Sequence, residues 1–441
     1  MRTRTSLVVA LLLALVLTAC GGGGAEAPEP EGSETAAEPT QAPTDGSEEP
    51  VERADSADGT LHLGYILPET GPIAYLGPPN IAAVRFAVER INEAGGVLGN
   101  EVTFASGDEA GDPDVARQAV DRHFADGVDA IIGAAASSIS LSIIDAITGA
   151  EVVQCSGVNT GDAFTDYDDG GYYFRTVPSN VLQGPVLANR IVEDGHARVA
   201  IASRADDYGR SLSGSVADAL REVGAEVTTE TSYDPNLADF SPVASELTAE
   251  DPDAVVLISF EEGAQILSHL IESGYGPDRI GLYGTDGMPL PELAEMVNPD
   301  DPSVLAGLTA TGASSGYDED FIAALQEFDP ELETTLFAPY TYDCVVIIAL
   351  AAEAAGSDDP VAFAPEIVGV TRDGQECTSF EECRDLLADA VDIDYTGASG
   401  PLDFIEQGEP SVGLYDVLVI DEQGEVTTDD TVLTEPMEED R

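Results

Sequence analysis

The chain has 441 residues, enough for two ordinary domains, and 43% of them are hydrophobic, so a substantial core can form. Its 84 acidic and 17 basic residues give a formal net charge of −67, and every strong cation is an arginine. This charge argues against binding to nucleic acid or to an anionic lipid surface, because both need clustered Lys or Arg, and it leaves open whether the surface is adapted to saline surroundings.

The first twenty residues have the layout of an export signal. Arg2 and Arg4 precede the apolar run 7–17, which is short for a membrane-spanning helix and ends in the letters L-T-A-C at Cys20. This ending resembles a bacterial lipobox, after which the cysteine is diacylated; an ordinary signal peptide that ends in Cys is the alternative. We therefore expect residues 1–19 to be removed and Cys20 to be the lipid anchor and the only attachment to a membrane.

The residues after Cys20 have the composition of a tether. Residues 20–58 are rich in Gly, Glu, Pro, Ala, Ser and Thr and contain almost no large apolar side chains. Such a segment cannot bury enough surface to fold. We expect a flexible tether that places the protein on the outer face of the bacterial cell membrane, and an acidic tail at residues 426–441.

Strand and helix patterns alternate from residue 61 onward. Apolar residues recur at helical spacing from Ile81 to Ile91, and the helix that they predict ends at Gly95-Gly96. A βα alternation of this kind predicts a parallel sheet covered by helices on both faces. The other elements predicted for this part are strands at 61–67, 102–105, 128–132 and 152–153 and helices at 112–125 and 140–148.

A second alternation begins at about residue 179. Two βα sheets joined by several crossings predict a two-lobed α/β protein with a cleft, and in such sheets ligands bind outside the carboxyl ends of the strands. The apolar run 345–352 is too short to span a membrane and predicts a buried helix. The predicted lobe one comprises residues 60–177 and 313–395, and the predicted lobe two comprises residues 178–312 and 396–425.

Two short runs of small and hydroxyl residues, 133–138 and 156–160, follow neighbouring predicted strands. Free backbone N–H groups, hydroxyls and the positive end of a helix favour an anion at such a place. A serine at a helix start is usually only an N-cap, and taken alone each hydroxyl residue would be interpreted as a cap or a turn residue. Together the two runs predict a binding site for the carboxylate and amine of a small extracellular solute.

Several motifs between residues 60 and 425 resemble the type I periplasmic binding proteins, and among these most closely the branched-chain amino-acid (leucine/isoleucine/valine) receptors of ABC importers. The resemblance implies a two-lobed fold in which each lobe is a parallel sheet flanked by helices, with hinge crossings between the lobes. The motifs are Gly71-Pro72-Ile73-Ala74, Ile91-Asn92-Glu93-Ala94-Gly95-Gly96-Val97-Leu98-Gly99, Phe174-Arg175-Thr176 and Asp207-Tyr208-Gly209.

In lobe one, the resemblance implies that Ser137 binds the ligand carboxylate and that Val158, through its backbone, and Thr160 bind the head group. Ala135 is expected to line the pocket, and Ser138 is an alternative to Ser137. The family's loop aromatic aligns with Leu76 in this chain, and Tyr75 can supply the ring instead. Val158 stands where the family has a small residue, so branched-chain specificity stays open.

In lobe two, the resemblance implies that Tyr208 closes over the ligand and that Asp286, where relatives often have Glu, meets the α-ammonium group. The run Thr285-Asp286-Gly287 is also typical of a simple turn. Phe260 is expected at the end of a lobe-two strand. For Phe260 and Tyr75, ordinary packing is an equally good interpretation.

The cysteines after Cys20 fall into two groups. Cys377 and Cys383 are separated by five residues in an exported chain, which predicts a local disulfide. Cys155 and Cys344 are expected to be buried free thiols, and a bond between them is left open. The four histidines are scattered without ligand spacing, so we predict no metal and no cofactor.

The motifs of common enzymes are missing. The chain has no P-loop, no Gly-x-Ser-x-Gly elbow and no His-Glu-x-x-His, which disfavours the alternative of a surface hydrolase. The resemblance implies a monomeric lipoprotein that captures a small amino-acid-like ligand, a branched-chain amino acid or a related acid or amide. It would deliver this ligand to the membrane permease of an ABC importer whose ATPase subunits are separate chains. The alternative is a ligand-sensing receptor of the same fold without transport.

Overall fold

The computed structural model describes residues 57–288 and 290–437. The predicted signal peptide, Cys20 and nearly all of the predicted tether lie outside these described residues. All statements below concern the described part of the chain.

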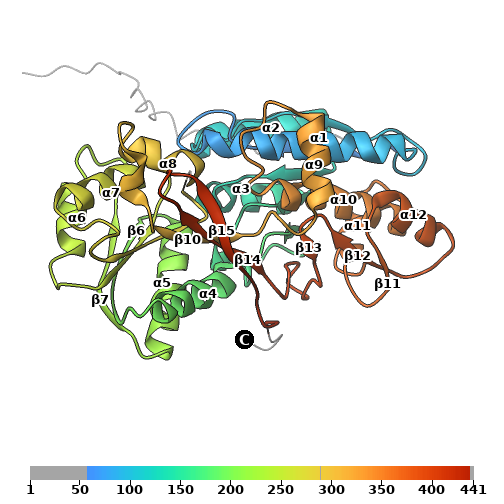
Figure 1. Cartoon of the computed structure of the whole chain (residues 1–441). Helices are drawn as coiled ribbons and strands as arrows, with labels where there is room; N and C mark the ends of the chain where they lie inside the picture. The colour runs from blue at the N-terminus through green and yellow to red at the C-terminus, as the bar shows by residue number, and fades with distance from the viewer. Residues whose placement is uncertain (1–56, 289, 438–441) are drawn as a thin grey trace, which may run out of the picture. The chain divides into compact units, whose positions relative to one another are not determined.

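The first lobe is built on a five-stranded parallel sheet in the order β2-β1-β3-β4-β5. Figure 1 labels the helices α1, α2 and α3 of this lobe, in blue to teal. Its first helix ends at Glu93, as the glycine pair predicts, because Gly96 has φ +74° and a Cβ there would lie 1.8 Å from the Asn100 carbonyl oxygen. The elements are β1 (His62–Ile66), α1 (Gly77–Glu93), β2 (Thr103–Ala105), α2 (Pro113–Asp126), β3 (Ala130–Gly133), α3 (Ser137–Thr148), β4 (Val153–Ser156) and β5 (Tyr173–Arg175).

The second lobe is built on a seven-stranded sheet in the order β15-β14-β10-β9-β8-β6-β7. Five of its strands are parallel, and β14 and β15 at one edge are antiparallel. The elements are α4 (Asn180–Glu193), β6 (Arg198–Arg204), α5 (Asp207–Glu222), β7 (Glu226–Tyr233), α6 (Ser241–Leu247), β8 (Ala254–Ile258), α7 (Gly263–Glu272), β9 (Gly281–Thr285), α8 (Leu290–Val297), β10 (Thr309–Ala313), β14 (Leu414–Ile420) and β15 (Val426–Leu433).

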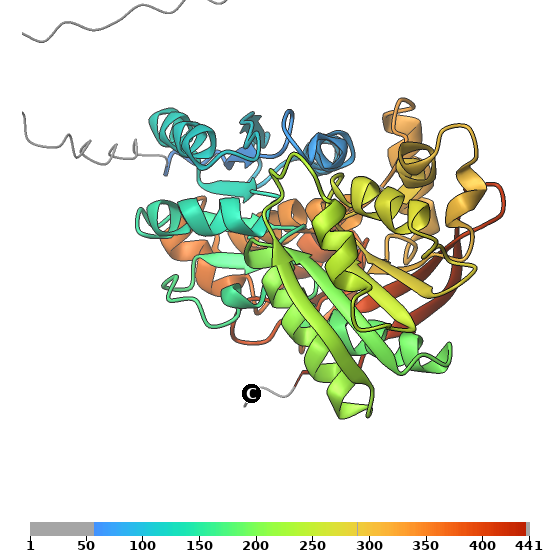
Figure 2. The same ribbon diagram turned by 90° about the vertical axis from the view of Figure 1, so that its left-hand side faces the viewer.

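Helices cover both faces of the seven-stranded sheet. In β6, Val199 and Ile201 pack into the core on the α4 and α5 face, whereas Ala200 and Ala202 pack with α6, α7 and α8. The central strands are continuous apolar runs because neither face meets water. The two layers can be followed by colour in Figure 2, green for α4 and α5 and yellow-green to yellow for α6 to α8.

The chain returns to the first lobe after β10. The apolar run 345–352 is fully buried within α10, which packs against α1. Among the described residues, α10 is the one helix long and apolar enough to cross a membrane by length and composition, and its burial identifies it as the predicted core helix. The elements here are α9 (Glu319–Phe328), α10 (Ala338–Ala355), α11 (Pro360–Phe363), β11 (Gln375–Cys377), α12 (Phe380–Ala388), β12 (Ile393–Gly397) and β13 (Gly400–Pro401).

The chain end differs from the expected acidic tail. Residues 426–433 form β15, which pairs with β14. Val426 and Val432 are half-buried, whereas the five residues between them, Asp429 and Asp430 included, are exposed, as suits a strand at the edge of a sheet. The acidic composition of residues 426–441 did not indicate that this stretch adds a strand to the second-lobe sheet.

Two disulfides are present among the described residues. Cys377 is bonded to Cys383, with Cα atoms 5.4 Å apart. Cys155 at the end of β4 is bonded to Cys344 in α10, 189 residues away. The expectation of two free thiols at Cys155 and Cys344 was therefore wrong, because only the folded first lobe brings β4 against α10.

Candidate functional site

A small buried cavity of about 20 Å³ lies between the two lobes, at the carboxyl ends of their strands. Seven of the nine predicted ligand residues line it, and Tyr75 and Ser138 do not. The first lobe also contributes Ile73, Leu76, Ala136 and Phe337, and the second contributes Gly287. The seven predicted residues are Ala135, Ser137, Val158, Thr160, Tyr208, Phe260 and Asp286.

Ser137 does not act as a helix cap. The helix α3 begins at Ser137, three residues earlier than predicted, and its N-cap is Ala136, which has no side-chain cap bond. The Ser137 hydroxyl instead accepts a hydrogen bond from the Gly161 amide at 3.4 Å. Ser137 therefore faces the loop that carries Thr160, across the lobe-one side of the cavity, and the geometry favours it over Ser138.

The two strand-exit loops of the first lobe are tied to each other. The Asn159 side-chain amide donates to the Ala135 carbonyl at 2.8 Å, and its oxygen accepts from the Tyr173 hydroxyl at 3.0 Å. The Ser156 hydroxyl donates to the Ala134 carbonyl at 2.9 Å. These bonds fix the relative positions of the loops before any ligand is present.

Behind the Ala135 loop lies a carboxyl group that the sequence did not single out. Glu109 is fully buried, and its carboxylate oxygens accept from the amides of Ala135 at 2.8 Å and Ala136 at 3.4 Å. Burial raises the pKa of Glu109 to about 8, because these two amides do not offset the lost hydration. At neutral pH this group is thus largely protonated and places no full charge behind the site.

Asp286 presents a buried carboxylate from the second lobe. It is 2% exposed, and its Oδ1 accepts from the Tyr208 hydroxyl at 2.9 Å and from the Gln183 amide at 3.2 Å. Among the described residues, no arginine or histidine forms an ion pair with it. Burial raises the pKa of Asp286, so the site favours a cation that would compensate the charge.

Tyr208 connects Asp286 to the start of α5. Asp206 caps this helix by accepting from the Gly209 amide at 2.9 Å, which places Tyr208 in the first turn. The Tyr208 oxygen also accepts from the Gly287 amide at 3.1 Å. The phenol is therefore held by the same β9 exit that carries Asp286.

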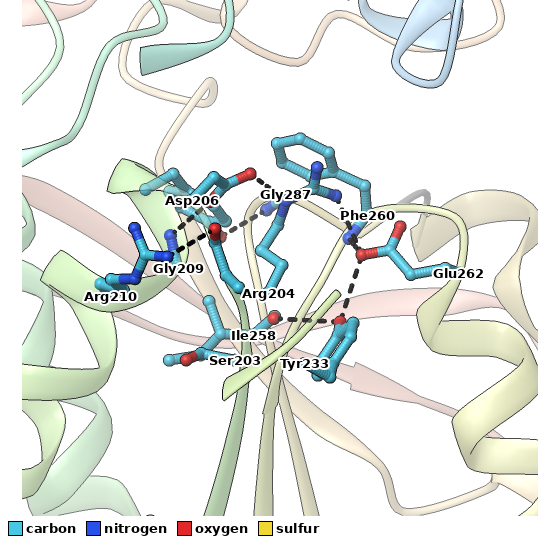
Figure 3. Close-up of polar contacts among 12 residues, drawn as sticks. Ser203, Arg204, Asp206, Gly209, Arg210, Tyr233, Ile258, Phe260, Glu262 and Gly287 are labelled. Carbon is cyan, nitrogen blue, oxygen red and sulfur yellow. Dashed lines mark hydrogen bonds and ion pairs between the residues drawn. The ribbon is translucent and has the colours of Figure 1, made fainter. Parts of the chain in front are cut away.

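Phe260 forms a fixed apolar wall beside Tyr208. The two rings stack with centroids 5.5 Å apart, and the guanidinium carbon of Arg204 lies 3.5 Å from the Phe260 centroid. Figure 3 shows Arg204 against this ring, with Glu262 and Asp206 close to its guanidinium. Arg204 is thus paired with Asp206 and Glu262, and it forms no ion pair with Asp286.

Phe337 reaches the cavity through an unusual backbone conformation. It has φ +63° directly before α10, a region that an aromatic residue seldom adopts. Its side chain is 2% exposed and lines the cavity. No sequence pattern indicates a positive φ at a phenylalanine, so this residue was missed.

A larger groove of about 870 Å³ lies along α4 and the residues after β15. It contains none of the predicted ligand residues, so its size does not make it the better candidate. The described residues also contain no group of three or more His, Cys, Asp or Glu side chains arranged to hold a metal ion.

Comparisons with known proteins agree with the motifs. A periplasmic binding protein family model matches residues 60–414. Leu/Ile/Val-binding protein homolog 1 of Brucella melitensis is 26% identical over 310 residues, covering 69% of this chain and 81% of that protein. The chemotactic signal transduction system substrate-binding protein BasB of Halobacterium salinarum is 27% identical over 372 residues, covering 80% and 85%.

Among solved structures, the leucine-binding protein LivK of Thermotoga maritima superimposes with a TM-score of 0.71 at 23% identity, covering 84% of this chain and 98% of that chain. This similarity shows the shared two-lobed fold, and the predicted fold class is confirmed. The chain belongs to the periplasmic binding protein family, a family of ligand-binding receptors, and within it is similar to the branched-chain amino-acid receptors.

Proposed function

We propose that the protein captures a small ligand with an amino-acid head group between its lobes. The observation that carries this proposal is the buried, uncompensated carboxylate of Asp286, which shares one cavity with the hydroxyl residues Ser137 and Thr160. An α-ammonium group would compensate Asp286 by charge-assisted hydrogen bonds. The hydroxyls and the first amides of α3 suit a carboxylate.

The remaining walls indicate the ligand's side chain. Ile73, Leu76, Val158, Phe260 and Phe337 are apolar and buried. A charged side chain would find no partner among them, so an aliphatic or small aromatic side chain fits best. The cavity of about 20 Å³ holds roughly one water molecule, so a ligand must enter a form in which the lobes are further apart.

The cellular role that we infer is delivery to an ABC importer. The lipobox-like ending at Cys20 and the tether-like composition of residues 20–58 support a lipid-anchored protein outside the cytoplasmic membrane. In this role the closed lobes dock on a permease, and ATP hydrolysis takes place on other chains. No catalytic role is proposed for the cleft.

Sensing is the second candidate, and one observation favours it. The relative BasB is, by its name, a substrate-binding protein of a chemotactic signal transduction system, and it matches 80% of this chain. Uptake of radiolabelled ligand by cells with and without the protein separates the two roles. Loss of uptake supports import, whereas normal uptake with a lost behavioural response supports sensing.

Ligand binding is tested by thermal unfolding against a panel of amino acids, amides, short peptides and aromatic acids. We expect one chemical group of the panel to raise the Tm of the wild type. Ser137→Ala and Thr160→Val should remove most of this shift, and Ser138→Ala is the matched control that should keep it. A panel without any stabilising compound would contradict the proposal.

A further inference from the structure

Arg175 lies behind the loop that carries Thr160, and it does not line the cavity. It is the last residue of β5, and its side chain is 1% exposed. Its Nη1 donates to the carbonyl oxygens of Asn159 at 3.1 Å and Gly161 at 2.6 Å. These two carbonyls belong to the residues before and after Thr160, so one guanidinium holds the loop on both sides of that residue.

The same guanidinium holds a chain segment that runs between the lobes. Glu409 lies in the connection from β13 to β14, and its side chain is 2% exposed. It forms a buried ion pair with Arg175 through Nη2 and accepts from Nε at 2.6 Å. The Arg175 amide also donates to the Gly408 carbonyl at 3.0 Å, which attaches the connection to β5 at a second point.

Thr165 completes the link. Its hydroxyl accepts from Arg175 Nη2 at 3.0 Å and donates to Glu409 Oε1 at 2.9 Å. Every polar atom of the pair is thereby used, either between the partners or on the loop of residues 159–165. Stability alone does not require such a pair, because well-packed apolar residues often stabilise a core equally well.

Resting on the proposed function, we propose that Arg175 and Glu409 are positioning residues that couple the Thr160 loop to the inter-lobe connection. Thr160 lies in a loop whose carbonyls are bonded to the Arg175 guanidinium, and the same guanidinium is bonded to Glu409 in the inter-lobe connection. A ligand bound by Thr160 is therefore coupled to that connection through Arg175. The affinity of the cleft therefore depends on a pair that does not contact the ligand.

The first test needs no ligand. Backbone hydrogen exchange of residues 158–162 is compared in the wild type, Glu409→Gln and Glu406→Gln. Glu406 is the matched control, because it lies in the same connection but pairs with Arg372 at the surface. We expect Glu409→Gln to speed exchange at these amides at least tenfold and Glu406→Gln to leave it unchanged. Unchanged exchange in Glu409→Gln would overturn the inference.

The second test is a double-mutant cycle with L-leucine, or the panel compound that stabilises the wild type most, measured by calorimetry. We expect Glu409→Gln to weaken binding about tenfold in the wild type and less than twofold when Thr160→Val is already present. Additive losses would show that the pair does not act through Thr160. If Glu409→Gln fails to fold, Thr165→Val replaces it in both tests, with a threefold weakening expected and the same overturning results.

The two proposals fail in different ways. Wild-type protein that binds no panel compound contradicts the ligand proposal, while the exchange test still decides the positioning role. Wild-type protein that binds, together with a Glu409→Gln variant of unchanged exchange and affinity, contradicts only the positioning role.

Discussion

The hydroxyl of Tyr75 donates a hydrogen bond of 2.5 Å to the carbonyl oxygen of Gly287, from the short 3-10 helix before α1 in the first lobe to the β9 exit in the second. Gly287 follows Asp286 directly, so this bond links the lobes at the residue proposed to meet the ligand. Tyr75, predicted as a possible ligand residue, does not line the cavity and instead holds the closed form.

Tyr75→Phe should favour the open form. A single neutral hydrogen bond contributes about 0.5–1.5 kcal/mol, so ligand affinity should fall roughly two- to tenfold. Small-angle scattering of the ligand-free protein should report a larger radius of gyration. Tyr65→Phe is the control, because Tyr65 donates to Glu69 within the first lobe. An unchanged radius and affinity in Tyr75→Phe would show that the bond does not bias closure.

Asp286→Asn should separate binding from stability. The variant loses the charge that attracts an ammonium group, and affinity should fall roughly 10- to 100-fold. Because burial raises the pKa of Asp286, its protonated carboxyl stabilises the folded state at low pH. This contribution is complete below the unfolded-state pKa and is lost as the pH rises through the folded-state pKa. At neutral pH the variant should therefore be at least as stable as the wild type in urea unfolding. Parallel losses of stability and affinity would argue for a structural role.

Glu109 should make stability depend on pH. Its pKa rises from 4.5 to about 8 on folding, so the folded state binds the proton more tightly. The free energy of unfolding should fall between pH 4.5 and pH 8 by up to about 4 kcal/mol from this group alone. Glu109→Gln should remove that slope, because an amide does not titrate in this range, while its oxygen can still accept from the Ala135 amide. The difference between the two proteins isolates Glu109 from other buried acids, such as Asp343 in α10, whose pKa burial also raises. Equal slopes would contradict the assignment.

The two disulfides should contribute unequally to stability. Cys155–Cys344 closes a far longer loop than Cys377–Cys383, with sequence separations of 189 and 6. Loop-closure entropy predicts a loss of about 5 kcal/mol for the double Cys→Ala variant of the first and about 2 kcal/mol for that of the second. Urea unfolding of the two variants gives the comparison. A larger loss from the shorter loop would contradict this order.

The two sheets could be predicted from the sequence, because strand and helix patterns alternate repeatedly along the chain. Apolar strands alternating with helices identify the two sheets, and Ser137, Thr160 and Asp286 follow those strands at positions that the family motifs mark. Glu109 could not be identified, because Gly107-Asp108-Glu109 reads as a polar loop and only the packing of β1 and β3 buries it. The Cys155–Cys344 disulfide could not be predicted either, because only the folded lobe brings β4 against α10.

The weakest predictions concerned which of two neighbours faces the cavity. Ser137 and Ser138, or Tyr75 and Leu76, differ by one residue in the sequence, and that step turns a side chain to another direction on a helix. The structure places Ser137 and Leu76 on the cavity. A register of this kind is set by where α3 and α1 begin, and helix starts are the least certain part of a sequence prediction.

The closed cavity limits the rate at which a ligand can be released. Eleven of the twelve residues around it are buried, and its volume is far below that of an amino acid. A captured molecule therefore cannot leave through a side opening and has to wait until the lobes separate. Its residence time is then limited by the opening rate of the hinge, so variants that loosen the Tyr75–Gly287 bond should release ligand faster even where every contact to the ligand is unchanged.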